Sequence, residues 1–312
     1  MKGFYDYFLE YWRRSSKPVF WMGLVLLTIL ITINYTVGIE RRIQGLGTWY
    51  LVYGAQAVFF GIVVTIIWGV QVRWGGAVMS KGLLRLLVVA VLLFSAKMVH
   101  WDLSSWLPGS PGSLWNRYWV IVTQLPAKLL LLLGVLCVLW RVCWLAVPEG
   151  RGFRGAVGLT TKGFHAGPYF GLLLLLVPLV ALASTQPDFL RVYPKVSAIA
   201  FINKYPGPLW LRQTGYELSY GLDFLSIELF FRGLLVIGVA RYAGEQAILP
   251  MAVFYCTIHF GKPLAECVTS FLGGMALGVL AYRTRSILGG LIVHLGLAWL
   301  MEVGGWVGHF YG

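Results

Sequence analysis

The most informative stretch of the sequence is residues 216–241, YELSYGLDFLSIELFFRGLLVIGVAR. The run is long and apolar enough to cross a bilayer, yet it carries Glu228 and Arg232 near its middle. Four residues apart on an α-helix, these two side chains share one face. An ionised group in hydrocarbon is costly, so such residues face the protein interior, pair with a partner and mark a functional site.

The composition of the chain indicates an integral membrane protein. Of its 312 residues 58% are hydrophobic and only 12% are charged, and the mean hydropathy is +0.75. A soluble domain has about 25% charged residues. The net charge of +13 comes from short basic clusters between apolar runs, which favours contact with anionic lipid over binding of nucleic acid.

Apolar runs of bilayer-spanning length recur along the whole chain. They predict an all-α fold, a polytopic integral membrane helical bundle with about nine transmembrane helices. The segment 246–260 is short for a span, and 119–147 contains Lys128. The predicted spans are 18–38, 49–72, 83–101, 119–147, 167–185, 217–240, 246–260, 267–282 and 286–306.

The chain is predicted to have three parts. An amphipathic, interfacial N-terminus over 1–17 combines aromatic residues with scattered charges. An additional transmembrane region with loops follows over 18–210, and the core that carries the site covers 211–312. No internal repeat is visible.

The loops between the predicted spans set the orientation of the chain. Residues 102–117 and 148–166 have loop compositions, and 186–214 is predicted as the longest loop, with a short interfacial helix over 193–202. With the N-terminus inside, the inner loops hold more Lys and Arg than the outer ones. The positive-inside rule therefore predicts a cytoplasmic N-terminus, in the cytoplasmic (inner) membrane.

Two histidines in apolar surroundings accompany the charged pair. His259 lies in AVFYCTIHFGKP and His294 in GGLIVHLGLA. Considered without the histidines, Glu228 and Arg232 are as well explained by a structural ion pair. Each histidine, considered by itself, is as well explained by a position in the core. Together, a carboxylate and two imidazoles on three apolar helices are what activation of water inside a membrane requires.

Metal binding is a weaker interpretation of the same residues. Cys256 and His259 are three apart, and Glu228 and His294 would complete four ligands. The chain has no HExxH motif, and its four cysteines form no CxxC pair. We therefore expect no cofactor, no zinc and no disulfide framework. A transporter is a further alternative, but the chain lacks the repeats typical of that class.

Three motifs resemble one protein family. SIELFFRG (226–233) is similar to the ExxxR helix motif of the CPBP family (CAAX protease and bacteriocin-processing, or Abi), which are intramembrane glutamic endopeptidases. AVFYCTIHFGKP (252–263) resembles the second motif of that family, and FLGGMALGVLAYRTRSILGGLIVHLGLA (271–298) its last two core helices. The resemblance covers about residues 215–300 and leaves the N-terminal two thirds outside it.

The resemblance implies a role for each matched residue. Glu228 and Arg232 correspond to the second Glu and the Arg of EExxxR, and His259 and His294 to the histidines of the later motifs. In the family these residues surround a water that attacks a peptide bond of a membrane-associated protein or peptide, and the histidines help to hold the oxyanion. The implied partners are thus a membrane-anchored substrate and the lipid bilayer.

Two positions depart from the family pattern. Ile227 stands where the family has the first Glu, which is generally assigned as the base, and Ala298 stands where an Asn is common. Glu228 then acts alone, or Asp223, about one turn before Ile227, supplies an auxiliary carboxylate. The alternative is a catalytically inactive member, a possible pseudoenzyme that scaffolds or regulates a partner enzyme.

The last two predicted helices contain further unusual residues. Their glycines are expected to allow close helix approach. Glu302 either caps a helix end or adds a carboxylate to the site. The glycines are Gly273, Gly274, Gly278, Gly289 and Gly290.

Overall fold

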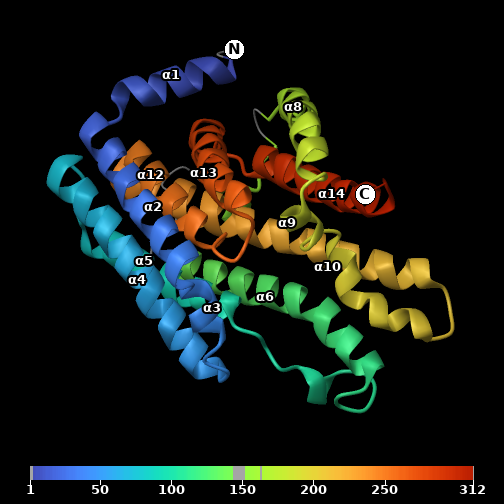
Figure 1. Ribbon diagram of the computed structural model, residues 1–312. Helices are drawn as coiled ribbons and strands as arrows, with labels where there is room; N and C mark the ends of the chain where they lie inside the picture. Colours follow the sequence, from blue (N-terminus) through green and yellow to red (C-terminus); the bar gives the residue numbers. More distant parts are fainter. Residues whose placement is uncertain (1–2, 143–151, 162–163, 312) are drawn as a thin grey trace. The chain divides into compact units, whose positions relative to one another are not determined.

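The computed structural model describes residues 3–142, 152–161 and 164–311, and within these ranges every regular element is a helix (Figure 1). This confirms the predicted all-α class. The first elements are α1 (Phe4–Arg14), α2 (Lys17–Val37), α3 (Ile39–Gln44), α4 (Trp49–Trp74), α5 (Lys81–Met98), η1 (Ser104–Trp106), α6 (Leu114–Val142), α7 (Phe153–Ala156) and α8 (Gly167–Ala183). The later elements are α9 (Pro187–Leu190), η2 (Lys195–Lys204), α10 (Leu209–Glu228), η3 (Leu229–Gly238), α11 (Ala240–Ala243), η4 (Gly244–Ala247), α12 (Ile248–Thr257), α13 (Leu264–Thr284) and α14 (Leu288–Tyr311).

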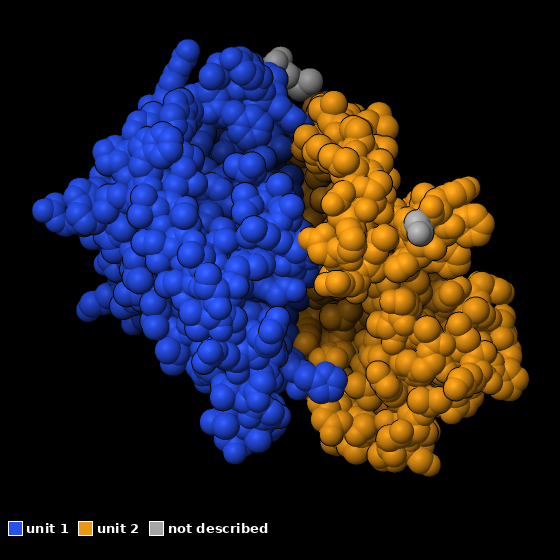
Figure 2. Space-filling view, viewed as in Figure 1, with its two compact units in different colours: residues 1–100, 136–164, 229–288 blue, residues 101–135, 165–228, 289–312 orange. Residues whose placement is uncertain are grey.

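The chain divides into two compact units, coloured separately in Figure 2. Unit 1 comprises residues 1–100, 136–164 and 229–288, and unit 2 comprises residues 101–135, 165–228 and 289–312. Both units are built from segments far apart in the sequence. The predicted three-part division instead follows consecutive residues along the chain, and it stays a prediction. Residues 143–147 of one predicted span and much of the predicted 148–166 loop lie outside the described residues.

Five of the described helices are long and apolar enough to cross a membrane, namely α2, α4, α6, α13 and α14. The predicted spans at 83–101, 167–185 and 246–260 correspond to α5, which carries three basic residues, to α8 with 17 residues and to α12 with 10 residues. The protein is therefore an integral membrane protein, and the count of about nine spans stays a prediction.

One face of α2 illustrates why the molecule belongs in lipid. Large apolar side chains at every fourth position of this helix are 39–60% exposed, while Val19, Gly23 and Leu27 are buried on the other face. An exposed apolar stripe of this length is unfavourable in water and is matched by hydrocarbon. The exposed residues are Trp21, Val25, Ile29 and Ile33.

A cluster of phenylalanines forms the centre of unit 1. The five rings come from α4, α5, η3 and α12, and neighbouring centroids lie 4.7–6.0 Å apart. All five are nearly inaccessible to solvent. Such ring pairs contribute about 0.5–1.5 kcal/mol each, so the cluster fixes η3 against the helices that precede it in the chain. The rings are Phe60, Phe94, Phe230, Phe231 and Phe254.

The amphipathic N-terminus forms α1, which unit 1 holds by charged side chains. Glu10 pairs with Arg14 at 2.6 Å and with Arg283 at the end of α13 at 3.5 Å. Arg283 also pairs with Glu245 of η4 at 2.9 Å. The helix is therefore tied to the elements that follow η3. That α1 lies along the membrane surface stays a prediction.

The predicted loop over 186–214 holds the short helix expected over 193–202, which is η2, and in unit 2 it is otherwise more helical than predicted. It contains α9, the 3₁₀ helix η2 and the start of α10. The Glu302 carboxylate on α14 accepts hydrogen bonds from the backbone N–H groups of Lys195 and Val196, at 2.6 and 3.0 Å. A carboxylate at a helix N-terminus stabilises that end. The contact spans 107 residues, so local sequence patterns do not reveal it.

Candidate functional site

The run that opens at Tyr216 does not form one uniform helix. α10 already begins at Leu209 and ends at Glu228, and η3 then continues as a π-helix to Gly238. Wide turns of this kind are frequent at functional sites. Glu228 thus lies at the junction of two helix types, and the α-helical period used to relate it to Arg232 ends at this residue.

Glu228 and His294 make a short polar contact at the candidate site. His294 Nδ1 lies 2.7 Å from Glu228 Oε1, and both residues belong to unit 2. The Glu228 side chain is fully buried and that of His294 is 14% exposed. A carboxylate only accepts hydrogen bonds, so Nδ1 carries the proton. In a neutral His294 ring the lone pair therefore lies on Nε2.

Gly290 makes room for this carboxylate. It lies one turn before His294 on α14, and a Cβ atom at this position would overlap with Glu228 Oε2. Gly289 is equally restricted, since a Cβ there would overlap with the Tyr169 ring. Both glycines were expected to allow close helix approach. The particular role of Gly290 beside Glu228 is a contact that the sequence does not indicate.

An aromatic row on α10 leads to His294. The Phe224 ring lies 5.5 Å from the His294 ring, and Tyr220 packs edge-on against Phe224 at 5.0 Å. Tyr216 stacks on Tyr220 at 6.2 Å, one turn further away. The apolar ring of Phe224 thus fixes the plane of the imidazole from one side. These residues lie within the opening stretch, but only their four-residue spacing indicates a common face.

Arg232 and His259 form a second group in unit 1, joined by Tyr255 of α12. The Arg232 guanidinium is fully buried and lies 4.5 Å from the centroid of the Tyr255 ring, within the range of a cation–π interaction. The Tyr255 ring also packs edge-on against the His259 ring at 4.7 Å. Sequence reasoning missed Tyr255, although a tyrosine four residues before His259 is visible in the second motif.

His259 has the same tautomer as His294. It lies just after α12 and is half-buried, and its Nδ1 lies 3.0 Å from the backbone oxygen of Tyr255. A carbonyl oxygen accepts, so Nδ1 is the donor and a neutral ring carries its lone pair on Nε2. Only the protonated imidazole donates a hydrogen bond from Nε2. In unit 2 the structure therefore brings Glu228 to His294. In unit 1 it brings Arg232 and His259 to Tyr255.

The positions that depart from the family pattern are apolar and buried. Ile227 is 9% exposed and Ala298 is 3% exposed. The expected auxiliary carboxylate, Asp223, is half-buried on α10. The other unexplained carboxylate, Glu302, caps η2 rather than accompanying His294.

The side chains proposed as a metal site have other neighbours. The Cys256 thiol points to Cys267, with its Sγ 3.1 Å from the Cys267 backbone oxygen. Among residues 3–142, 152–161 and 164–311, no three His, Cys, Asp or Glu side chains lie together as metal ligands would. Zinc needs four such ligands in a structural site and three in a catalytic one.

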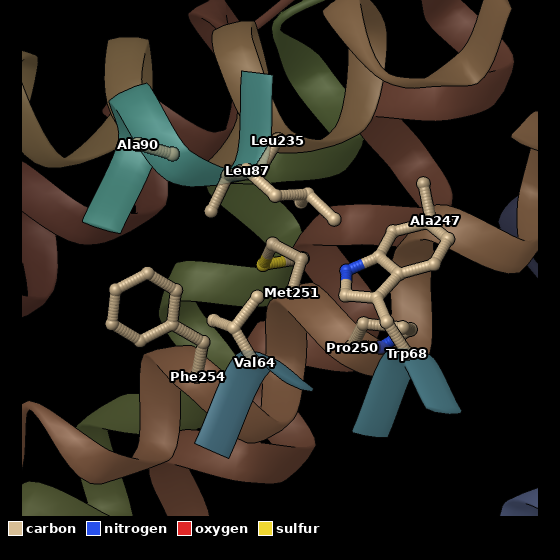
Figure 3. Close-up of a pocket in the computed structure, with 9 residues that line it drawn as sticks. All are labelled: Val64, Trp68, Leu87, Ala90, Leu235, Ala247, Pro250, Met251 and Phe254. Atoms are coloured by element: carbon tan, nitrogen blue, oxygen red, sulfur yellow. The ribbon is translucent and has the colours of Figure 1, made fainter. Parts of the chain in front are cut away.

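A small cavity in unit 1 is apolar and does not include the candidate residues. Its volume is about 10 Å³, room for about one water. Figure 3 shows the side chains that line it, which come from α4, α5, η3, η4 and α12. Apart from Trp68, whose ring nitrogen is the one side-chain polar atom among the labelled residues, the lining is hydrocarbon and thioether.

Together these features define an all-helical integral membrane protein with a buried carboxylate that contacts a partly exposed imidazole. Residues 221–300, about a quarter of the chain, match the protein-family model described as type II CAAX prenyl endopeptidase Rce1-like. The match is consistent with the CPBP family and confirms the resemblance for this C-terminal part. No curated protein and no solved structure matches the chain.

Proposed function

We propose that the protein is an intramembrane glutamate-type endopeptidase that cleaves a membrane-anchored protein or peptide. The observation that carries this proposal is the 2.7 Å contact between Glu228 and His294, inside the residues that match the CAAX endopeptidase model. A buried carboxylate that orients an imidazole is an arrangement used for general-base catalysis in hydrolases.

In the proposed mechanism His294 and Glu228 activate water as a pair. His294 is the more accessible partner, and its Nε2 accepts the proton of the attacking water. The fully buried Glu228 carboxylate holds the ring in place through Nδ1 and stabilises the imidazolium that forms. This differs from the expectation that Glu228 itself takes the proton. His294 then returns the proton to the leaving amine.

For Arg232 and His259, which belong to unit 1, we propose the roles that the family resemblance implies. Arg232 follows Glu228 by four residues in the chain, and its charge opposes that of the carboxylate. Because the Tyr255 carbonyl occupies Nδ1 of His259, this histidine binds the oxyanion through Nε2 only when protonated. The mechanism needs no bound metal or other cofactor. Asp223 on α10 stays the proposed auxiliary carboxylate.

The matched family model suggests the substrate class. Its description names CAAX prenyl endopeptidases, so the first substrate to test is a prenylated peptide that ends in a CAAX sequence. Such a substrate would be held at the bilayer by its lipid. The membrane itself is the second proposed partner, and no nucleic acid is involved.

Cleavage of a prenylated CAAX peptide by the purified protein in vesicles tests the proposal. Glu228→Gln keeps a hydrogen-bond acceptor but removes the charge, and His294→Ala removes the base. We expect each variant to lose about 10²–10⁴-fold in cleavage rate. Glu217→Gln, a change on the same helix outside the pair, should retain it. Full activity of both site variants would refute the assignment.

A scaffold without turnover is the second candidate function. The observation that favours it is the buried Ile227 in place of the first family Glu. In that case no cleavage product accumulates with any substrate, whereas Glu228→Gln reduces association with a partner protein. Detection of a single cleaved peptide that depends on Glu228 would exclude this role.

The orientation of the chain is also a proposal. We propose the cytoplasmic (inner) membrane, with the N-terminus in the cytoplasm, because the Lys and Arg residues of the predicted loops favour that side. Accessibility of an N-terminal epitope tag to protease in sealed and in opened vesicles tests it. Cleavage of the tag from the periplasmic side would reverse the orientation.

A further inference from the structure

Cys256 near the end of α12 and Cys267 in the first turn of α13 lie against one another in unit 1. Both are fully buried, and their sulfur atoms are 3.8 Å apart. The Cys256 Sγ also lies 3.1 Å from the Cys267 backbone oxygen. The two thiols are therefore in contact across two packed helices, although their sequence spacing is unlike that of any dithiol motif.

The thiol pair adjoins the turn that carries His259. The backbone N–H of His259 donates to the Cys256 carbonyl at 3.0 Å. From α2, the Tyr35 hydroxyl donates to the backbone oxygen of Lys262 at 2.6 Å and also interacts with the Cys267 thiol. The two cysteines thus bracket a short, well-connected turn between α12 and α13.

The separation of the two sulfur atoms is close to what a disulfide requires. Bonded sulfurs lie about 2.05 Å apart and need suitably placed Cβ atoms. From 3.8 Å, side-chain rotation with a small shift of the helices closes the remaining distance.

We propose that Cys256 and Cys267 are a redox modification site, at which an intramolecular disulfide forms and fixes the His259 turn. Two S–H bonds break and one S–S bond forms. Two protons and two electrons pass to an oxidant of the quinone or peroxide class: a quinone is reduced to the quinol, and hydrogen peroxide to two molecules of water. Apolar surroundings favour a lipid-soluble oxidant. The bond forms whether or not the proposed peptidase function is correct.

Mass spectrometry of the full-length protein in lipid vesicles tests the proposal. The protein is treated with diamide or with a short-chain quinone, denatured in acid and alkylated with N-ethylmaleimide. We expect Cys256 and Cys267 to escape alkylation and to share one disulfide-linked peptide, which reduction separates. Cys137, which is exposed, should remain alkylated. Alkylation of both residues after oxidation, or bonds only between two chains, would overturn the proposal.

Variants in which one cysteine of the pair is replaced provide the matched control. In Cys256→Ser, Cys267 should become alkylated to the same extent with and without oxidant, and the converse should hold for Cys267→Ser. A second measurement, heat unfolding in detergent, should give a higher midpoint after oxidation only when both cysteines are present. An equal rise in the variants would show that the oxidant acts elsewhere. Since these readouts do not involve cleavage, failure of the proposed function would leave them unchanged.

Discussion

The space beside Glu228 depends on the absence of one side chain. A Cβ at position 290 would overlap with Glu228 Oε2, so we expect Gly290→Ala to push the carboxylate away from His294. Displacements of about 1 Å at such groups cost about 10²-fold in rate. The proposed peptidase activity should fall by at least that factor.

Gly273→Ala is the matched control for this variant. Position 273 lies on α13, and a Cβ there would meet no atom within 4 Å. Cleavage rates and heat-unfolding midpoints of both variants separate loss of positioning from loss of folding. Combining Gly290→Ala with the shorter Glu228→Asp should restore part of the activity. Unchanged cleavage by Gly290→Ala would show that Glu228 is not held against His294 during the reaction.

The proposed chemistry is carried by Glu228 and His294 without a metal. The Cys256 thiol, a ligand in the metal-site interpretation, faces Cys267. Prolonged dialysis of the protein against EDTA and 1,10-phenanthroline should therefore leave the cleavage rate unchanged, whereas a zinc peptidase loses activity. Metal content measured on the same samples identifies which case holds. Activity that disappears with chelation and returns with zinc would contradict the mechanism.

At the scale of elements, Glu302 connects α14 to η2. Its carboxylate accepts two backbone hydrogen bonds from Lys195 and Val196 while being 7% exposed. Charge-assisted bonds of this kind contribute about 1.5–3 kcal/mol each, and a buried loss costs more than an exposed one. We expect Glu302→Gln to lower the free energy of unfolding by about 1–3 kcal/mol, measured by thermal or denaturant unfolding in detergent.

A surface pair supplies the control for this variant. Glu266 pairs with Lys262 at 3.2 Å, and both side chains are partly exposed. An ion pair in that environment contributes about 0–1 kcal/mol, so Glu266→Gln should have little effect. Equal destabilisation by the two variants would mean that the Glu302 cap on η2 contributes no more to the free energy of unfolding than the surface ion pair does.

Local sequence patterns predicted the helices better than the contacts between them. α2, α4 and α13 match predicted spans within a few residues, because apolar length is a local property. The α-to-π junction at Glu228 and the cap from Glu302 depend on packing between distant segments. For the site, motif resemblance selected Glu228 and His294, but composition alone does not reveal their hydrogen bond or the space left by Gly290.

At the scale of the whole molecule, the family match and the folding units have different extents. The match begins at residue 221 and ends at residue 300. Unit 1 combines η3, α12 and α13 with α2, α4 and α5 from the first hundred residues. The N-terminal region was predicted to be an addition to the core that carries the site. In unit 1, α2, α4 and α5 of this region pack with η3, α12 and α13 in one interior.

This shared interior predicts that residues 211–312 do not fold by themselves. Four ring pairs join Phe60 and Phe94 to Phe230, Phe231 and Phe254, and together such pairs contribute about 2–6 kcal/mol. Lipid tails replace the lost hydrocarbon contact but not this close packing. The fragment should therefore aggregate in size-exclusion chromatography under conditions in which the full chain is monodisperse. Co-expression with residues 1–210 should improve recovery of the fragment, because residues 1–210 supply the rings of Phe60 and Phe94. A monodisperse fragment that unfolds cooperatively would mean instead that the aromatic cluster only attaches the N-terminal helices to an independent core.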